Sequence, residues 1–126
     1  MQLQSIATDL APAPLGHYSQ AVTCNDTVYV SGQLPIIPGT ELSMPIGIEN
    51  QARQTLENLR MILEAAGSGI DRIASVSIFI PDVSLWPSVN AVYTQFMGKH
   101  RPARTVVPTT PLHLGALIEI SAVAAK

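Results

Sequence analysis

The chain has 126 residues, of which 47% are hydrophobic and 13% are charged, and its formal net charge is −2. This length is enough for one domain, residues 1–126, and too short for two ordinary ones. The weak acidic balance and the scattered basic residues exclude the positive surface typical of nucleic-acid binders, and no apolar stretch is long enough to span a membrane. A surface this poor in charge predicts that a second subunit covers part of it, because small monomers rarely expose large apolar areas.

Cysteine content and the N-terminal residues favour the cytoplasm. Cys24 is the only cysteine, which excludes an internal disulfide and any multi-cysteine metal site. The opening residues "MQLQSIATDLAPAP" have neither the basic start nor the apolar segment of a signal peptide. We therefore expect a cytoplasmic protein.

The first predicted elements are a strand and a long helix. Alternating and β-branched residues predict a strand over residues 28–33. Residues 37–45 are rich in turn formers and predict a loop. Apolar residues then recur at the helical spacing over residues 48–66, and Gly67 supplies the stop.

The second half of the chain predicts a strand, a helix and two more strands. Residues 72–81 alternate as a strand, and helical spacing follows from an N-cap at Ser84 to Gly98. Two strands, near residues 104–107 and 116–124, finish the chain. This order predicts an α+β fold, with one mixed sheet and both helices on one of its faces. The other face needs a cover, and a neighbouring subunit is the simplest one.

Two charged residues lie inside these last strands. Arg104 begins a β-branched run, and Glu119 shares one face of the final strand with mostly apolar residues. Charges in such positions are costly unless they are paired or used. One interpretation is a structural salt bridge between the two within the sheet. The other is a site in which Arg104 offers a planar fork to a substrate carboxylate and the desolvated Glu119 handles a water or a proton.

The remaining reactive residues predict no further site. His17, His100 and His113 lack the spacing of a known metal motif, so we assign no metal. Cys24 lies in a turn beside Asn25 with no adjacent base and is interpreted as a passive thiol. The sequence contains no phosphate-binding glycine loop and no G-x-S-x-G elbow.

Five segments resemble, in order and spacing, the Rid (reactive intermediate deaminase) family, also called the YjgF-like proteins. They are "APAPLGHYSQAV", "VYVSGQLPI", "SVNAVYTQF", "RPARTVV" and "LIEISAVAA", and the resemblance covers residues 11–124. It implies a chorismate-mutase-like fold and a homotrimer with sites in clefts between subunits. It also implies an enzyme that hydrolyses enamines and imines, such as 2-aminoacrylate, to the 2-oxo acid and ammonia without a cofactor.

The same resemblance assigns roles to individual residues. Arg104 in "PAR" matches the family's carboxylate-binding arginine, and Glu119 in "IEI" matches the acidic residue that holds a water near the imine carbon. The other positions that resemble the family's site lining are Tyr18, Ser31, Asn90 and, mainly through backbone groups, Gly32 and Val106.

The chain departs from the family pattern at several of these positions. His17 replaces the proline of the frequent "GPYSQ", and His113 occupies a place often held by another residue. Thr105 and Val106 stand in place of a common Ser-Cys pair, although valine keeps the backbone amide. The two histidines either reshape the pocket for a different substrate or are partly exposed loop residues.

Two other functions are weighed against imine hydrolysis. An endoribonuclease activity has been attributed to some relatives, but the acidic balance and the lack of a basic groove argue against it. The alternative is a non-catalytic or chaperone-like trimer, in which Arg104 only holds small 2-oxo acids. The expected partners are therefore a small imine, enamine or 2-oxo acid and other copies of the chain, with no nucleic acid and no membrane.

Overall fold

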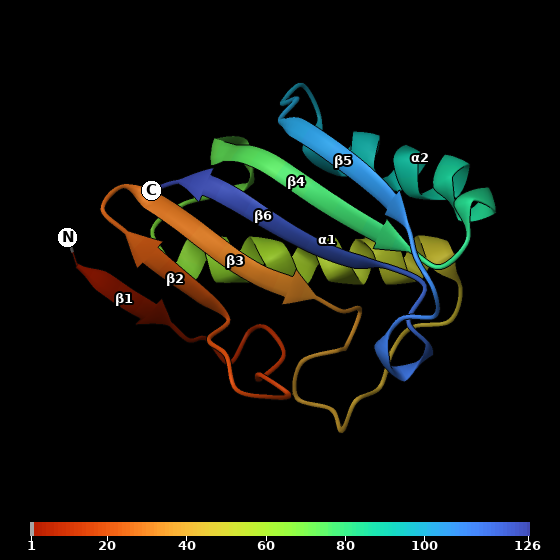
Figure 1. The fold of residues 1–126 in the computed structure, drawn as a ribbon, viewed down its shortest axis with the longest axis horizontal. Helices are drawn as coiled ribbons and strands as arrows, with labels where there is room; N and C mark the ends of the chain where they lie inside the picture. The colour runs from red at the N-terminus through yellow and green to blue at the C-terminus, as the bar shows by residue number, and fades with distance from the viewer. Residues whose placement is uncertain (1) are drawn as a thin grey trace.

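Six β-strands form one mixed sheet in the computed structural model, which describes residues 2–126 (Figure 1). The strands are β1 (Leu3–Ile6), β2 (Ala21–Cys24), β3 (Thr27–Gln33), β4 (Ile73–Ile80), β5 (Ala103–Pro108) and β6 (Glu119–Ala125). Their order is β1-β2-β3-β6-β4-β5, so the last strand of the chain lies inside the sheet. Neighbouring strands are antiparallel except β4 and β5, which are parallel because a helix carries the chain back between them.

Two α-helices, α1 (Ile48–Ala65) and α2 (Trp86–Met97), cover one face of this sheet. Helix α1 packs against β3 and β6, and α2 packs beside α1. The α+β arrangement expected from the order of the elements is therefore confirmed. In the described part of the chain, no helix has the length and apolar character that crossing a membrane would require.

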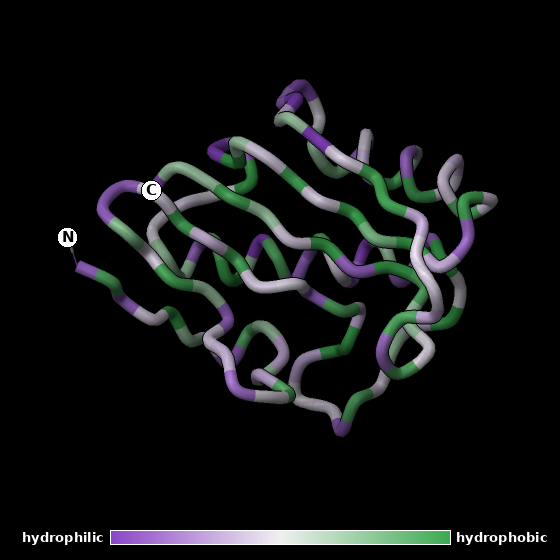
Figure 2. The backbone as a smooth tube through the Cα atoms, viewed as in Figure 1, coloured by the Kyte–Doolittle hydropathy of each residue, from purple (hydrophilic) through white to green (hydrophobic). Residues whose placement is uncertain are grey.

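Alternation along the strands decides which side chains form the core. On β4, Val76, Ile78 and Ile80 face the helices and are at most 2% exposed. Figure 2 shows hydrophobic and polar residues alternating along neighbouring strands. The apolar stripe of α1 closes this layer, and burying one such side chain stabilises the fold by about 1.5–3 kcal/mol.

The helices end and begin near the predicted residues, with one correction. Helix α1 ends within one residue of the prediction, and Gly67 stops it with a φ of 81°. Helix α2 does not start from a cap at Ser84, because Ser84 belongs to a separate 3-10 helix (Val83–Leu85). The carboxylate of Asp82 caps that short helix by accepting a hydrogen bond from the Ser84 N–H at 2.8 Å. Helix α2 therefore begins later, at Trp86.

The sequence-based prediction missed two strands. It also misplaced Cys24 and the start of the final strand. Strands β1 and β2 were missed because each has only four residues and β1 lies exposed at the sheet edge. Cys24, expected in a turn, is the last residue of β2. The final strand starts at Glu119 instead of residue 116, because His113–Gly115 form a 3-10 turn in which Leu114 has a φ of 61°. The other predicted strands are confirmed as β3, β4 and β5.

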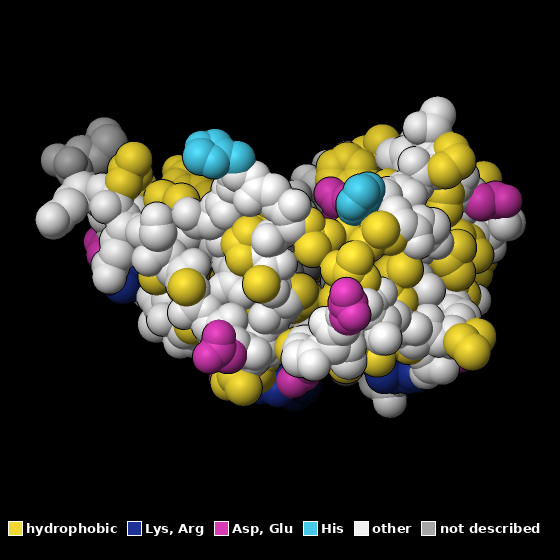
Figure 3. Space-filling model, turned by 90° about the horizontal axis from the view of Figure 1, so that it is seen from below, with side chains coloured by type: hydrophobic (Ala, Val, Ile, Leu, Met, Phe, Trp, Pro, Cys, Tyr) yellow, Lys and Arg dark blue, Asp and Glu magenta, His cyan; other side chains and the backbone are white. Residues whose placement is uncertain are grey.

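Three loops gather at one end of the sheet. They are residues 7–20 between β1 and β2, residues 34–47 before α1, and residues 109–118 before β6. Figure 3 views the molecule from this end and shows a hollow whose rim carries histidine and acidic side chains among hydrophobic ones. Side chains from distant parts of the sequence therefore meet here.

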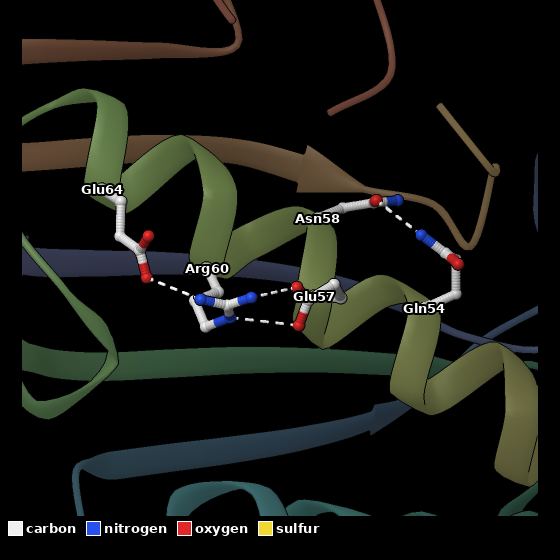
Figure 4. Close-up of polar contacts among 5 residues, drawn as sticks. All are labelled: Gln54, Glu57, Asn58, Arg60 and Glu64. Atoms are coloured by element: carbon white, nitrogen blue, oxygen red, sulfur yellow. Dashed lines mark hydrogen bonds and ion pairs between the residues drawn. The ribbon is translucent and has the colours of Figure 1, made fainter. Parts of the chain in front are cut away.

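A buried amide of α1 holds one of these loops in place. Asn58 is fully buried, and its Nδ2 donates to the carbonyl oxygens of Leu34 at 3.0 Å and Ile36 at 2.9 Å. Its Oδ1 accepts a hydrogen bond from Gln54 one turn earlier (Figure 4). Asn58 thus satisfies two carbonyls at the start of the loop that have no strand partner.

A second buried amide connects the other end of this loop, and the segment before β6, to the same helix. Gln51 donates from Nε2 to the carbonyl oxygen of Pro45 at 3.0 Å. Its Oε1 accepts the N–H of Leu117, just before β6, at 2.9 Å. Helix α1 therefore positions residues 34–47 and 109–118 through side-chain hydrogen bonds.

The exposed side of α1 carries a network of ion pairs. Arg60 lies between Glu57 and Glu64, and its Nη1 is 2.8 Å from Oε2 of Glu64 (Figure 4). The hydrogen bond with Glu57 raises the pKa of Arg60. Because these side chains are more than a third exposed, the network contributes at most about 1 kcal/mol to folding.

Replacing Asn58 should cost far more stability than breaking these ion pairs. Asn58→Ala leaves a buried and a partly buried carbonyl oxygen without donors, and we expect the free energy of unfolding to fall by about 2–4 kcal/mol. Arg60→Ala, on the same helix, should change it by less than about 1 kcal/mol. Urea denaturation of both variants measures the difference. Equal losses would show that the amide network does not hold the loop.

Candidate functional site

Glu119 points away from the helices into a cavity of about 460 Å³ at the loop end of the sheet. It is half-buried, and its neighbour Ile120 faces the core, as alternation along a strand requires. The cavity walls come from the loop of residues 7–20, from β3 and the residue after it, and from the turn before β6. The lining residues are Leu15, Gly16, Tyr18, Ser31, Gly32, Leu34, His113 and Glu119.

The carboxylate of Glu119 lies directly against the backbone of β3. The pairing of β3 with β6 shifts register between Val30 and Gln33, and Gly32 falls within this irregularity. A Cβ atom on Gly32 would overlap Oε2 of Glu119 and would lie 3.1 Å from its Cδ. Gly32 therefore positions the carboxylate because it lacks a side chain.

The hydroxyl groups in the cavity wall keep part of their hydrogen-bonding capacity. The Tyr18 hydroxyl accepts the N–H of Leu15 at 3.1 Å, so its own hydrogen stays available to donate. The Ser31 hydroxyl donates to the carbonyl oxygen of Ser19 at 2.6 Å, so its lone pairs stay available to accept. Among residues 2–126, Glu119 has no ion-pair partner. The cavity thus contains a carboxylate without an ion-pair partner, together with one free hydrogen-bond donor and one free acceptor.

Arg104 lies elsewhere, at the edge of the sheet. It is on β5, opposite Val76, and its guanidinium extends over α2. The guanidinium carbon lies 4.6 Å from the ring centre of Trp86 and 4.9 Å from that of Tyr93. Its Nη1 donates to Oδ1 of Asn90 at 3.0 Å. These contacts fix an otherwise exposed arginine beside a second cavity of about 420 Å³.

Tyr93 is the buried member of this second group. Its side chain is 6% exposed, and its hydroxyl has no hydrogen-bond partner among residues 2–126. Desolvation raises the pKa of Tyr93, and the nearby charge of Arg104 opposes this rise. The phenol therefore stays neutral at physiological pH and presents its ring face to the guanidinium.

Arg104 and Glu119 do not form the salt bridge that the sequence allowed. Arg104 is opposite Val76, which faces the helices, whereas Glu119 is opposite Phe79, whose side chain is on the other face. The two cavities that they line share no residue. A site that uses both groups therefore cannot be assembled from one copy of the chain.

The other predicted residues divide between the two cavities. Tyr18, Ser31 and Gly32 lie with Glu119, and Asn90 lies with Arg104. The side chain of Val106 packs against the core, which leaves only its backbone for a role in a site.

The two unusual histidines have different positions. His113 lines the cavity of Glu119, on the turn that contains the left-handed Leu114. His17 is exposed and does not line that cavity, although it precedes Tyr18. The interpretation of these histidines as exposed loop residues without a role in the pocket therefore fits His17 better than His113.

Sequence reasoning missed the aromatic partners of Arg104. Trp86, Asn90 and Tyr93 are spaced four and three residues apart, which puts them on one face of a helix. That spacing was a usable signal. It was overlooked because the sequence does not show which residues of β5 and α2 pack against each other.

Comparisons with known proteins identify the family. The endoribonuclease L-PSP family model matches residues 8–126. A rat protein named 2-iminobutanoate/2-iminopropanoate deaminase is 36% identical over 96% of this chain and 88% of its own length. The crystal structure of the YjgF gene product from E. coli has a TM-score of 0.93 and 37% identity, covering 98% of each chain. That of E. coli TdcF with bound serine has a TM-score of 0.93 and 35% identity, again covering 98% of each chain. The chain therefore belongs to the endoribonuclease L-PSP family, which includes the YjgF and Rid proteins.

Proposed function

We propose that this protein hydrolyses small carboxylate-bearing imines and enamines, such as 2-aminoacrylate, to 2-oxo acids and ammonia. The observation that carries this proposal is the Glu119 carboxylate, half-buried against Gly32 and without an ion-pair partner in its cavity. The name of the rat relative supports the reaction, and the serine bound to TdcF supports a ligand with a carboxylate beside a nitrogen.

The active site is formed between two subunits of a chorismate-mutase-like homotrimer. Arg104 and Asn90 of one copy complete the cavity that holds Tyr18, Ser31 and Glu119 in the next. Two features support this assembly. Each copy contains the two halves in separate cavities, and no element among residues 2–126 covers the sheet face on which Tyr29 is 51% exposed. A neighbouring sheet would cover that face.

The chemistry needs few groups because a protonated imine is already electrophilic. An enamine such as 2-aminoacrylate becomes this imine when its terminal carbon takes a proton from solvent. Arg104 binds the substrate carboxylate and so fixes the imine carbon. Glu119 accepts a proton from a water as its oxygen bonds to that carbon, which forms a tetrahedral carbinolamine. The proton then passes to the nitrogen and the C–N bond breaks. The hydroxyl proton of the carbinolamine returns to Glu119 as its oxygen becomes the carbonyl of the 2-oxo acid. One water is consumed and one ammonia is released.

The remaining groups stabilise the intermediates of this sequence. The free hydrogen of the Tyr18 hydroxyl and the backbone amide of Val106 can donate to oxygen atoms of the substrate, and Ser31 can accept from its nitrogen. The electron count does not change, so these steps require neither an oxidant nor a cofactor.

Two alternatives are tested alongside hydrolysis. Ribonuclease activity follows from the name of the family, but the net charge of −2 and the single arginine assigned to the proposed site do not provide the basic groove that a polynucleotide requires. A non-catalytic trimer would bind 2-oxo acids without turnover. An assay that follows imine hydrolysis, RNA cleavage at several salt concentrations and 2-oxo acid binding on one preparation separates the three.

Substituting Arg104 should lower activity in a graded way. Arg104→Lys keeps the charge but loses the planar fork, so kcat/KM for imino acids should fall about 10-fold, and Arg104→Ala should lower it about 100-fold. The thermal midpoint of the alanine variant should stay close to that of the unaltered protein, because Arg104 is exposed and forms no salt bridge within residues 2–126. Imino acids generated by an amino acid oxidase provide the assay. Full activity of Arg104→Ala would contradict the proposed role.

Mixing two inactive variants should restore activity if each site uses two subunits. We expect Arg104→Ala and Glu119→Gln each to lose nearly all activity alone. Co-refolded in equal amounts, they should recover about a quarter of the original activity, because about a quarter of the interfaces in random trimers pair two intact halves. Light scattering checks the trimer. A monomer, or no recovery in mixed trimers, would contradict the intersubunit site.

The two histidines should differ in their effect on substrate choice. His113→Ala enlarges the cavity, so the ratio of kcat/KM for the imine of leucine to that of alanine should rise by about tenfold. His17→Ala is the matched control and should leave this ratio unchanged, because His17 does not line the cavity. Equal ratios in all three proteins would show that His113 has no role in substrate choice.

A further inference from the structure

The only tryptophan of the chain lies under the arginine assigned to the substrate carboxylate. Trp86 is the first residue of α2, is half-buried and packs against the edge of the core. Its ring centre is 4.6 Å from the guanidinium carbon of Arg104. Tyr93, two turns later on the same helix face, brings a second ring to 4.9 Å. Arg104 therefore rests on two aromatic faces supplied by one rigid element.

These contacts leave a defined part of the guanidinium free. Asn90 occupies Nη1 with a hydrogen bond of 3.0 Å. Among residues 2–126, no acceptor binds the edge formed by Nε and Nη2. That edge presents two parallel N–H donors, which is the geometry that binds a carboxylate with two hydrogen bonds. The free edge is thus the one suited to the substrate.

An arginine on an edge strand would otherwise adopt many conformations. Arg104 is exposed, and a long side chain loses conformational entropy when a ligand immobilises it. A side chain that is already held in the binding geometry avoids most of that loss, so preorganisation strengthens binding. An aromatic face also attracts the cation without using its N–H donors.

We propose that Trp86, assisted by Tyr93, is a positioning residue that holds Arg104 with its Nε–Nη2 edge open to the carboxylate of the ligand. This inference rests on the proposed function, because it assumes that Arg104 binds the carboxylate. It adds that affinity for carboxylates depends on a side chain that does not itself touch the ligand. It also makes the indole a spectroscopic reporter of the site.

The test titrates the trimer with 2-oxobutanoate, a stable 2-oxo acid, and follows the fluorescence of Trp86. We expect a saturable change in emission, because the ligand neutralises the cation stacked on the indole. 2-Butanone, which has the same carbon skeleton without the carboxylate, should give no change. Arg104→Ala should abolish the response to 2-oxobutanoate.

Calorimetry then measures the variants that lack the tryptophan. Trp86→Leu should raise the Kd for 2-oxobutanoate and the KM for imino acids about tenfold, while kcat stays within about threefold. Trp86→Phe retains a ring and should recover most of the affinity. Phe96→Leu removes another half-buried aromatic ring from α2 and should leave Kd unchanged, because Phe96 lines a different cavity, beside residues of α1.

Each outcome decides one of the two proposals. If the unaltered protein neither binds 2-oxobutanoate nor hydrolyses imines, the proposed function is wrong. If it binds and hydrolyses but Trp86→Leu does so equally well, the positioning role is wrong. Should Trp86→Leu fail to fold, the emission response of the unaltered protein decides, and an emission of Trp86 that does not change on ligand binding overturns the inference.

Discussion

The placement of β6 between β3 and β4 is the constraint on which the rest of the structure depends. This last strand pairs along both edges, and its alternate residues Ile120, Ala122 and Ala124 enter the core. Since side chains alternate along a strand, Glu119 must then face away from the helices. A slip of one residue would bury the carboxylate and expose the isoleucine, so the same apolar contacts that stabilise the sheet also orient the candidate catalytic group.

Buried polar groups connect this core to the walls of the cavity. The amides of Asn58 and Gln51 project from α1 and satisfy backbone groups of the loops that precede α1 and β6. A loop held only by its ends would leave these carbonyls to water and would move freely. With the amides in place, Leu34 and the turn at His113 have fixed positions on two sides of the cavity. Stability and site geometry therefore depend on the same few hydrogen bonds.

Glu119 and Arg104 are both held without a compensating charge among the described residues. Glu119 and Arg104 lie on opposite faces of the sheet, and neither has an ion-pair partner within residues 2–126. Each is instead held by groups that leave its charge uncompensated: Gly32 admits the carboxylate, and two aromatic rings support the guanidinium. Such an arrangement suits a substrate that carries both a carboxylate and an electrophilic carbon. The low charge of the remaining surface suits an assembly that covers the open sheet face.

The sequence by itself determined the elements whose signals are local. The apolar stripe of residues 48–66, the alternation along β3 and β4 and the faces of β6 follow from periods that neighbouring residues define. The motifs around Arg104 and Glu119 also singled out the two charged groups on which the proposed site rests. Tertiary structure decided which groups meet. The separation of Arg104 from Glu119, the contact of Gly32 with the carboxylate, the stacking of Trp86 on Arg104 and the different positions of His17 and His113 all depend on strand register and helix packing. These contacts join residues far apart in the chain, and no local period specifies them.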